Sequence, residues 1–195
     1  MKFILGKKLE MSQIFDEKGN VIPVTLIEAG PCFVTQIKTK EKDGYEAIQV
    51  GFEKLKEKKV KKPQKTKPFK YLREFKGDIS QYKVGQEINV SIFQEGEKVK
   101  ISGLTKGKGF AGAVKRWGFV NKAKAHGAKD GRKLGSVGMR WPQRVIKGRK
   151  MAGRMGQERV TVRNLQIVKI DPENNILAVK GAVPGSRGTL LEIRN

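Results

Sequence analysis

The sequence predicts a mainly-β fold built around a small antiparallel barrel or closed sheet. Its apolar residues gather in short runs rich in Val, Ile and Thr, and turns containing Gly, Asp or Pro separate the runs. Most connections leave little room for the crossover helices that join parallel strands. The strands are therefore expected to pair antiparallel and to close on themselves.

Five strands are predicted before the middle of the chain. Each is short and partly alternates apolar with polar residues, as a half-buried strand does. The turns DEKGN, AGP and KDG separate the first of them. The predicted strands are residues 21–28, 33–38, 47–52, 88–93 and 98–102.

The strand pattern returns near the C-terminus. Residues 158–171 and 176–181 flank the turn PENN and predict a hairpin, and residues 189–193 give a last short strand. If strands from both parts of the chain share one sheet, residues 106–154 are an insertion into it. Within the insertion only residues 110–119 (FAGAVKRWGF) predict a short helix, with Phe110, Val114 and Trp117 on one side.

Positive charge is concentrated in two windows. Residues 106–154 hold 15 basic residues and one acidic residue, Asp130, a net charge of +14. Residues 54–76 hold 11 basic and two acidic residues, a net charge of +9, and the two windows together account for the whole net charge of +23. The other 123 residues carry 16 basic and 16 acidic side chains, so they form a neutral body.

These two windows call for different interpretations. Residues 54–76 are rich in Lys, and they form either a solvated face or a second contact to an anionic partner. Residues 106–154 carry 14 uncompensated charges that repel one another, which predicts a polyanionic partner.

Cysteine content and hydropathy indicate the compartment. Cys32 is the only cysteine, so no intrachain disulfide can form, and its apolar setting (PCFV) predicts a small core residue. The N-terminal apolar run is too short for a signal peptide, and no stretch approaches the roughly 20 apolar residues of a membrane span. We expect a cytoplasmic protein with no membrane contact.

Catalysis is not expected. The segment GKGFAG formally matches a dinucleotide-binding pattern, yet the buried strand that such a fold needs is missing, so no cofactor is predicted. His126 and Asp130 could act as a base and its partner, but no local signature places a nucleophile beside them. A metal site would lack ligands, and the most basic window has one carboxylate where nuclease chemistry needs a cluster. No small-molecule substrate is expected.

Residues suited to RNA recur through the insertion. Trp141 has the neighbours Arg140, Pro142, Gln143 and Arg144, which favours stacking on RNA over burial in a core. Arginine forks bind phosphate, and glycines allow close approach of the backbone. The candidate RNA-contacting side chains are Lys106, Lys108, Lys115, Arg116, Lys122, Lys124, His126, Arg132, Lys133, Arg140, Trp141, Arg144, Lys147, Arg149, Lys150 and Arg154. The candidate glycines are Gly107, Gly109, Gly138, Gly148 and Gly153.

Long motifs carry a family resemblance. GKKLEMSQIFDEKGNVIPVTLIEA, DGYEAIQVGF, GKGFAGAVKRWGF, GRKMAGRMGQERVTVRNL and VKGAVPGSRG occur in this order. The chain resembles the universal third protein of the large ribosomal subunit in its bacterial form.

That resemblance implies a fold and partners. It implies a translation-protein-type β-barrel made of residues 1–105 and 156–195, with the basic insertion 54–76. It also implies an extended, irregular basic finger, residues 106–155, that penetrates 23S rRNA toward the peptidyl transferase centre. An early role in subunit assembly and contact with the fourteenth and nineteenth large-subunit proteins belong to the same implication.

Within the finger the chain departs from the bacterial pattern. His126 matches the bacterial pattern, but the rest of the segment HGAKDGRK differs from it. The segment GMRWPQ is one residue shorter than its bacterial counterpart. Met139 stands where some members carry a methylated glutamine, so that modification is not expected here. Trp141 followed by Pro142 is similar to archaeal and eukaryotic fingers.

One other class stays open as an alternative, and a further class is disfavoured. A nucleoid-type DNA-binding protein would need charge alone. An RNA-modifying enzyme would need a cofactor site or a clustered acid and base, which the sequence does not offer.

Overall fold

The computed structural model describes residues 2–77, 79, 81–121, 125–127 and 131–195. Their contacts divide them into two compact units, one made of residues 1–104 and 159–195, and the other of residues 105–158.

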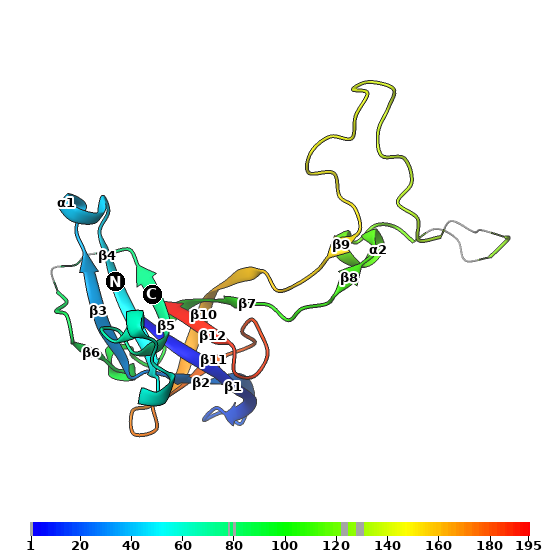
Figure 1. The fold of residues 1–195 in the computed structure, drawn as a ribbon. Coiled ribbons are helices and arrows are strands. Elements are labelled where there is room, and N and C mark those ends of the chain that lie inside the picture. The colour runs from blue at the N-terminus through cyan, green and yellow to red at the C-terminus, as the bar shows by residue number, and fades with distance from the viewer. Residues whose placement is uncertain (1, 78, 80, 122–124, 128–130) are drawn as a thin grey trace. The chain divides into compact units, whose positions relative to one another are not determined.

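Six antiparallel strands of the first unit close into a barrel (Figure 1). Their order around it is β1-β12-β7-β10-β11-β2, so strands from the two ends of the chain pair with each other. The predicted mainly-β fold and closed antiparallel barrel are therefore confirmed. The bounds are β1 Phe3–Phe15, β2 Val21–Ala29, β7 Lys98–Leu104, β10 Arg159–Asp171, β11 Ile176–Lys180 and β12 Leu190–Arg194.

A four-stranded antiparallel sheet accompanies the barrel, in the order β5-β4-β3-β6. The helix α1 lies in the connection between its two central strands, where Gly44 ends it in the left-handed conformation at φ 78°. Two 3-10 turns, η1 and η2, precede β5. The bounds are β3 Cys32–Lys38, α1 Lys40–Asp43, β4 Ala47–Lys54, η1 Glu57–Lys59, η2 Lys62–Gln64, β5 Phe69–Phe75 and β6 Glu87–Ile88.

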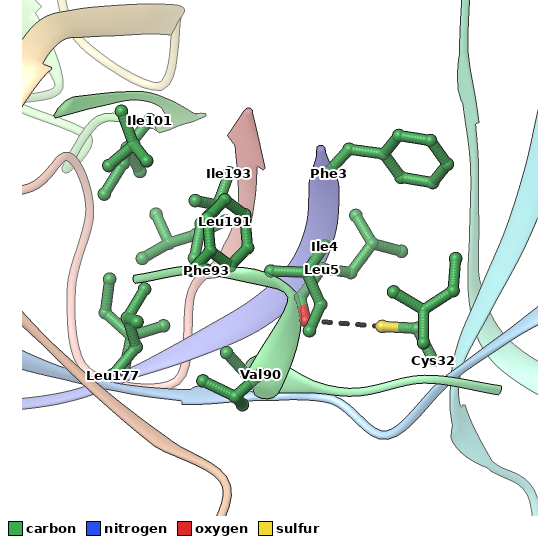
Figure 2. Close-up of a cluster of buried hydrophobic side chains, with 14 of the residues drawn as sticks. Phe3, Ile4, Leu5, Cys32, Val90, Phe93, Ile101, Leu177, Leu191 and Ile193 are labelled. Atoms are coloured by element: carbon green, nitrogen blue, oxygen red, sulfur yellow. Dashed lines mark hydrogen bonds between the residues drawn. The ribbon is translucent and has the colours of Figure 1, made fainter. Parts of the chain in front are cut away.

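One core serves the barrel and this sheet. Figure 2 shows side chains of β1, β7, β11 and β12 converging with Val90 and Phe93. Phe3 stacks on Phe75 with ring centroids 4.4 Å apart, which links β1 to β5. The thiol of Cys32 is buried and donates to the backbone oxygen of Leu5 over 3.5 Å, so the predicted core position of this residue is confirmed.

The predicted strand at 88–93 is wrong over most of its length. Only Glu87–Ile88 pair as β6, and Val90–Ile92 form the 3-10 turn η3. Val90 and Phe93 are both buried and lie three residues apart, which fits three residues per turn better than alternation along a strand.

Two strands of the first unit, β1 and β5, are absent from the sequence prediction. In β5 the residues Phe69, Tyr71 and Phe75 lie at even spacings, but the eight lysines from Lys54 to Lys67 dominate the surrounding composition. The high charge of this window therefore obscured the strand pattern of β5, which pairs with β4.

The second unit holds two short strands and one helix, β8 Phe110–Ala111, α2 Ala113–Trp117 and β9 Gly153–Arg154. The predicted helix at 110–119 is thus wrong in extent. Phe110 pairs with Arg154 in a strand, and Gly118 ends the helix at φ 70°. Phe110 is 81% exposed, so no apolar face runs from it along a helix.

Candidate nucleic-acid interface

The two ends of residues 105–158 are joined by backbone hydrogen bonds. Thr105 N–H donates to the oxygen of Glu158 over 2.9 Å, and Lys108 N–H donates to the oxygen of Met155 over 2.9 Å. Met155 N–H returns a bond of 2.9 Å to the oxygen of Gly109. We call this ladder, residues 105–109 and 155–158, the neck. These hydrogen bonds hold the two extended segments together, and the rest of the unit lies between them in the sequence.

Gly156 is required by the neck, although the sequence prediction did not include it. Its φ is 75°, and a Cβ built there would lie 2.2 Å from the backbone oxygen of Lys106. A side chain would therefore need both a strained backbone and a displaced partner segment. No local sequence signal distinguishes this glycine from its neighbours.

Within the segment between the two neck strands, the end of α2 is hydrogen-bonded to Met151, shortly before β9. Arg116 Nη1 and Trp117 Nε1 donate to the backbone oxygen of Met151 over 3.1 and 2.8 Å. The guanidinium carbon of Arg116 lies 5.0 Å from the centre of the Trp117 ring, and Lys150 Nζ lies 5.7 Å from it. Two aromatic-cation contacts and two hydrogen bonds therefore hold this part together.

Gly153 has a role inside the protein. A Cβ at this position would lie 2.5 Å from Arg116 Nη1, so the glycine makes room for the guanidinium. Gly107, Gly109, Gly138 and Gly148 have no atom within 4 Å of the corresponding point. Of the five candidate glycines, these four have open space where a Cβ would stand.

Residues 131–152 contain neither helix nor strand, and besides the bonds of Met151 to Arg116 and Trp117 some hydrogen bonds join residues within the stretch. Ser136 Oγ donates to the oxygen of Gly138 over 2.9 Å, and Arg149 Nη2 donates to the oxygen of Ser136 over 3.1 Å. The peptide bond between Trp141 and Pro142 is cis. No carboxylate occurs from residue 131 to residue 157, so this stretch cannot neutralise its own cations.

Trp141 lies at the surface. It is 72% exposed, which argues against the alternative of a core tryptophan, and the neighbouring Met139 is 89% exposed. The backbone thus presents a large ring that is mostly exposed and lies among arginines in the sequence.

The candidate cations are exposed, with one exception. Arg116 is half-buried against Met151 and Gly153, and Arg154 bonds to Gln157. Lys122 and Lys124, like Asp130, lie outside the described residues, so the pairing of His126 with Asp130 does too. The exposed candidates are Lys106, Lys108, Lys115, His126, Arg132, Lys133, Arg140, Arg144, Lys147, Arg149, Lys150 and Arg154.

Part of the other basic window is paired with polar groups of its own sheet. Lys67 Nζ donates to the side-chain oxygens of Gln36 and Gln49 over 2.5 and 2.7 Å. Lys70 pairs with Glu53 at 3.0 Å, and Lys54 lies 4.4 Å from the centre of the Phe33 ring. The lysines of the two 3-10 turns are exposed instead. Both interpretations of this window, a solvated face or a contact to an anionic partner, stay predictions for its exposed lysines.

The described residues offer no group of three or more His, Cys, Asp or Glu side chains that could hold a metal ion. Over the same part of the chain, no helix is long and apolar enough to cross a membrane.

Known proteins match this chain over almost its whole length. The family described as ribosomal protein L3 matches residues 75–175, which include the neck and everything between its strands. A large ribosomal subunit protein uL3 of Carboxydothermus hydrogenoformans is 56% identical over 201 residues, covering 99% of this chain and 96% of that protein. The uL3 proteins of Fervidobacterium nodosum and Thermotoga petrophila are each 54% identical, covering 100% of this chain and 98% and 97% of their own. The chain belongs to the ribosomal protein L3 family.

Proposed function

We propose that the protein is a structural constituent of the large ribosomal subunit that binds 23S rRNA directly through residues 106–155. The barrel anchors the protein, and the finger fills space within folded RNA and neutralises its phosphates. The role is structural and involves no turnover. The finger supports early subunit assembly and reaches toward the peptidyl transferase centre, and the fourteenth and nineteenth large-subunit proteins are its neighbours.

One observation carries the proposal. Residues 131–157 contain no carboxylate, residues 131–152 contain neither helix nor strand, and Arg140, Arg144 and Lys147 are exposed on this irregular backbone. Such a segment needs its counter-charge from outside the protein. RNA supplies phosphates at short intervals and bases on which Trp141 can stack.

The experiment measures the affinity of the full chain for 23S rRNA as a function of salt concentration. Each neutralised phosphate contributes roughly 0.7 to 0.9 to the slope of log affinity against log salt. A triple variant, Arg140→Gln, Arg144→Gln and Lys147→Gln, is expected to lower the slope by about two. The matched control removes the same charge from the barrel and its sheet, by Lys18→Gln, Lys42→Gln and Lys180→Gln.

Equal slopes for wild type and the triple variant, or a slope near zero for wild type, would refute direct phosphate binding by the finger. Co-sedimentation distinguishes the DNA-binding alternative, because a constituent of the subunit stays with it in moderate salt. A chain that leaves the subunits and follows DNA would belong to the other class.

A further inference from the structure

The outer face of the barrel carries a pocket over β7, β10 and β12. Ile101, Leu191 and Ile193 point into the core. Since side chains alternate along a strand, Ser102 and Glu192 point outward, and they are cross-strand partners. Arg73 of β5 closes one side. The pocket has a volume of about 290 Å³, and Leu104 and Leu190 supply its apolar part.

A nearly buried carboxylate organises the arginines around this pocket. The Glu192 side chain is 10% exposed. Its Oε1 lies 3.3 Å from Arg73 Nε, and its Oε2 accepts from Arg194 Nη2 over 3.0 Å and also from Arg159. Three arginines surround one glutamate, so the cluster keeps two positive charges after internal pairing. A carboxylate held this way fixes the direction of each guanidinium.

The two arginines that line the pocket retain N–H groups that are not used in hydrogen bonds within the described part of the chain. The Arg73 and Arg159 side chains are 48% and 56% exposed. Within the described part of the chain, Arg73 uses Nε and Nη1, and Arg159 uses Nη2. Arg73 Nη2 and the Nε and Nη1 groups of Arg159 therefore have no acceptor there. The Ser102 hydroxyl lies 2.7 Å from that of Thr161 and adds a further polar group.

The residual charge and these unused donors point to an anion. From the cluster we infer that this pocket binds one phosphodiester group of RNA, clamped between Arg73 and Arg159, with the adjoining ribose against Leu104 and Leu190. The inference deepens the proposed function, on which it rests, by adding a contact on the barrel that is separate from the finger residues.

The geometry favours phosphate over a protein carboxylate. Two guanidinium groups come from different strands and lie on either side of the same glutamate. A tetrahedral phosphate has oxygens that can meet two forks from different directions, whereas a planar carboxylate matches one fork. The volume of about 290 Å³ lies at the lower end of ligand pockets and suits a single sugar-phosphate unit.

The pocket also lies where the chain leaves the barrel and returns to it. Leu104 is the last residue of β7 and Arg159 the first of β10, and they are partners in the ladder. A contact here would fix RNA at the root of the insertion.

Phosphate-ethylation footprinting of 23S rRNA bound to the full chain tests the inference. We expect wild type to protect a phosphate that the double variant Arg73→Gln, Arg159→Gln leaves unprotected. The salt slope should fall by roughly 0.7 to 0.9, the share of one phosphate. Arg163→Gln, on the same strand as Arg159 but outside the pocket, is the matched control and should keep the protection. Arg159→Lys keeps the charge beside Glu192 without the fork, and should weaken the protection without unfolding the barrel.

Identical footprints and slopes for wild type, the double variant and Arg159→Lys would overturn the inference while leaving RNA binding by the finger intact. So would an unchanged footprint with loss of a neighbouring protein from purified subunits, which would assign the pocket to a carboxylate. If wild type protects no phosphate anywhere, the proposed function itself fails.

Discussion

At the scale of single residues, Trp141 and Trp117 show two uses of the same side chain. Trp117 donates its indole N–H to Met151 and lies beside two cations, so the protein uses it internally. Trp141 is 72% exposed and has no ring contact among the described residues. The surface of this ring is therefore accessible to a binding partner.

Replacing Trp141 by Ala is expected to weaken binding to 23S rRNA while leaving the barrel folded. Loss of one stacked base costs about 1–3 kcal/mol of binding, and an exposed substitution changes folding stability by less than about 0.5 kcal/mol. Filter binding and thermal unfolding measure the two effects. Met139→Ala is the control, and Trp141→Phe should restore part of the affinity. A barrel that melts at lower temperature in the Ala variant would show that the ring packs inside the protein.

Sequence reasoning identified the exposed cations and Trp141 because charge and aromatic content are local properties. The internal contacts of Gly153 and Gly156 could not be predicted, because Arg116 and Lys106, which a Cβ there would meet, lie about 37 and 50 residues away in the sequence. A close approach between distant segments leaves no mark in the neighbouring sequence.

At the scale of elements, the neck depends on one backbone conformation. Gly156→Ala is expected to open it, because the left-handed conformation costs roughly 1–2 kcal/mol for a residue with a Cβ and the Lys106 oxygen must also move. Hydrogen exchange of the Thr105, Lys108 and Met155 amides should accelerate at least tenfold, while the melting temperature of the barrel stays the same. Gly107→Ala, where a Cβ has open space, is the control. Unchanged exchange in Gly156→Ala would mean that the neck bonds contribute nothing to stability.

Alternation and turn residues were sufficient for β2, β3, β4, β7 and the β10–β11 hairpin, whose predicted and observed bounds nearly agree. The failures have specific causes. At η3 the buried residues repeat every three positions, and around β5 the lysines outnumber the aromatic residues that form the packed face. At α2, glycines restrict the helix to five residues. Each case required knowing which neighbour the segment packs against.

At the scale of the whole molecule, Cys32 reports on the stability of the shared core. Burial raises the pKa of its thiol to about 12, and the thiol donates to the Leu5 oxygen. The folded protein therefore holds the proton more tightly than the unfolded chain, whose thiol has a pKa of about 8.5. This contribution to stability is complete below about pH 8.5 and is lost as the pH rises toward 12.

We expect Cys32 to react with a maleimide only at the rate of global unfolding at pH 7.5. Between about pH 9 and 11 the free energy of unfolding should fall up to roughly 1.4 kcal/mol per pH unit more steeply than in Cys32→Ala, which lacks this proton. Denaturant unfolding at several pH values measures the difference. Rapid labelling of folded protein, or parallel pH profiles for the two chains, would contradict a core that opens only as a whole.

The pairing of Leu104 with Arg159 has a consequence for how the chain can vary. These two residues are partners in one antiparallel ladder. The fold of the barrel therefore requires only that the segment joining them leaves and returns at this pair. The entropy of closing such a loop grows only with the logarithm of its length. A two-residue Asn-Gly turn could therefore join β7 to β10 as an ordinary hairpin. The barrel can therefore accept insertions of different length and sequence between these two residues without changes to its core.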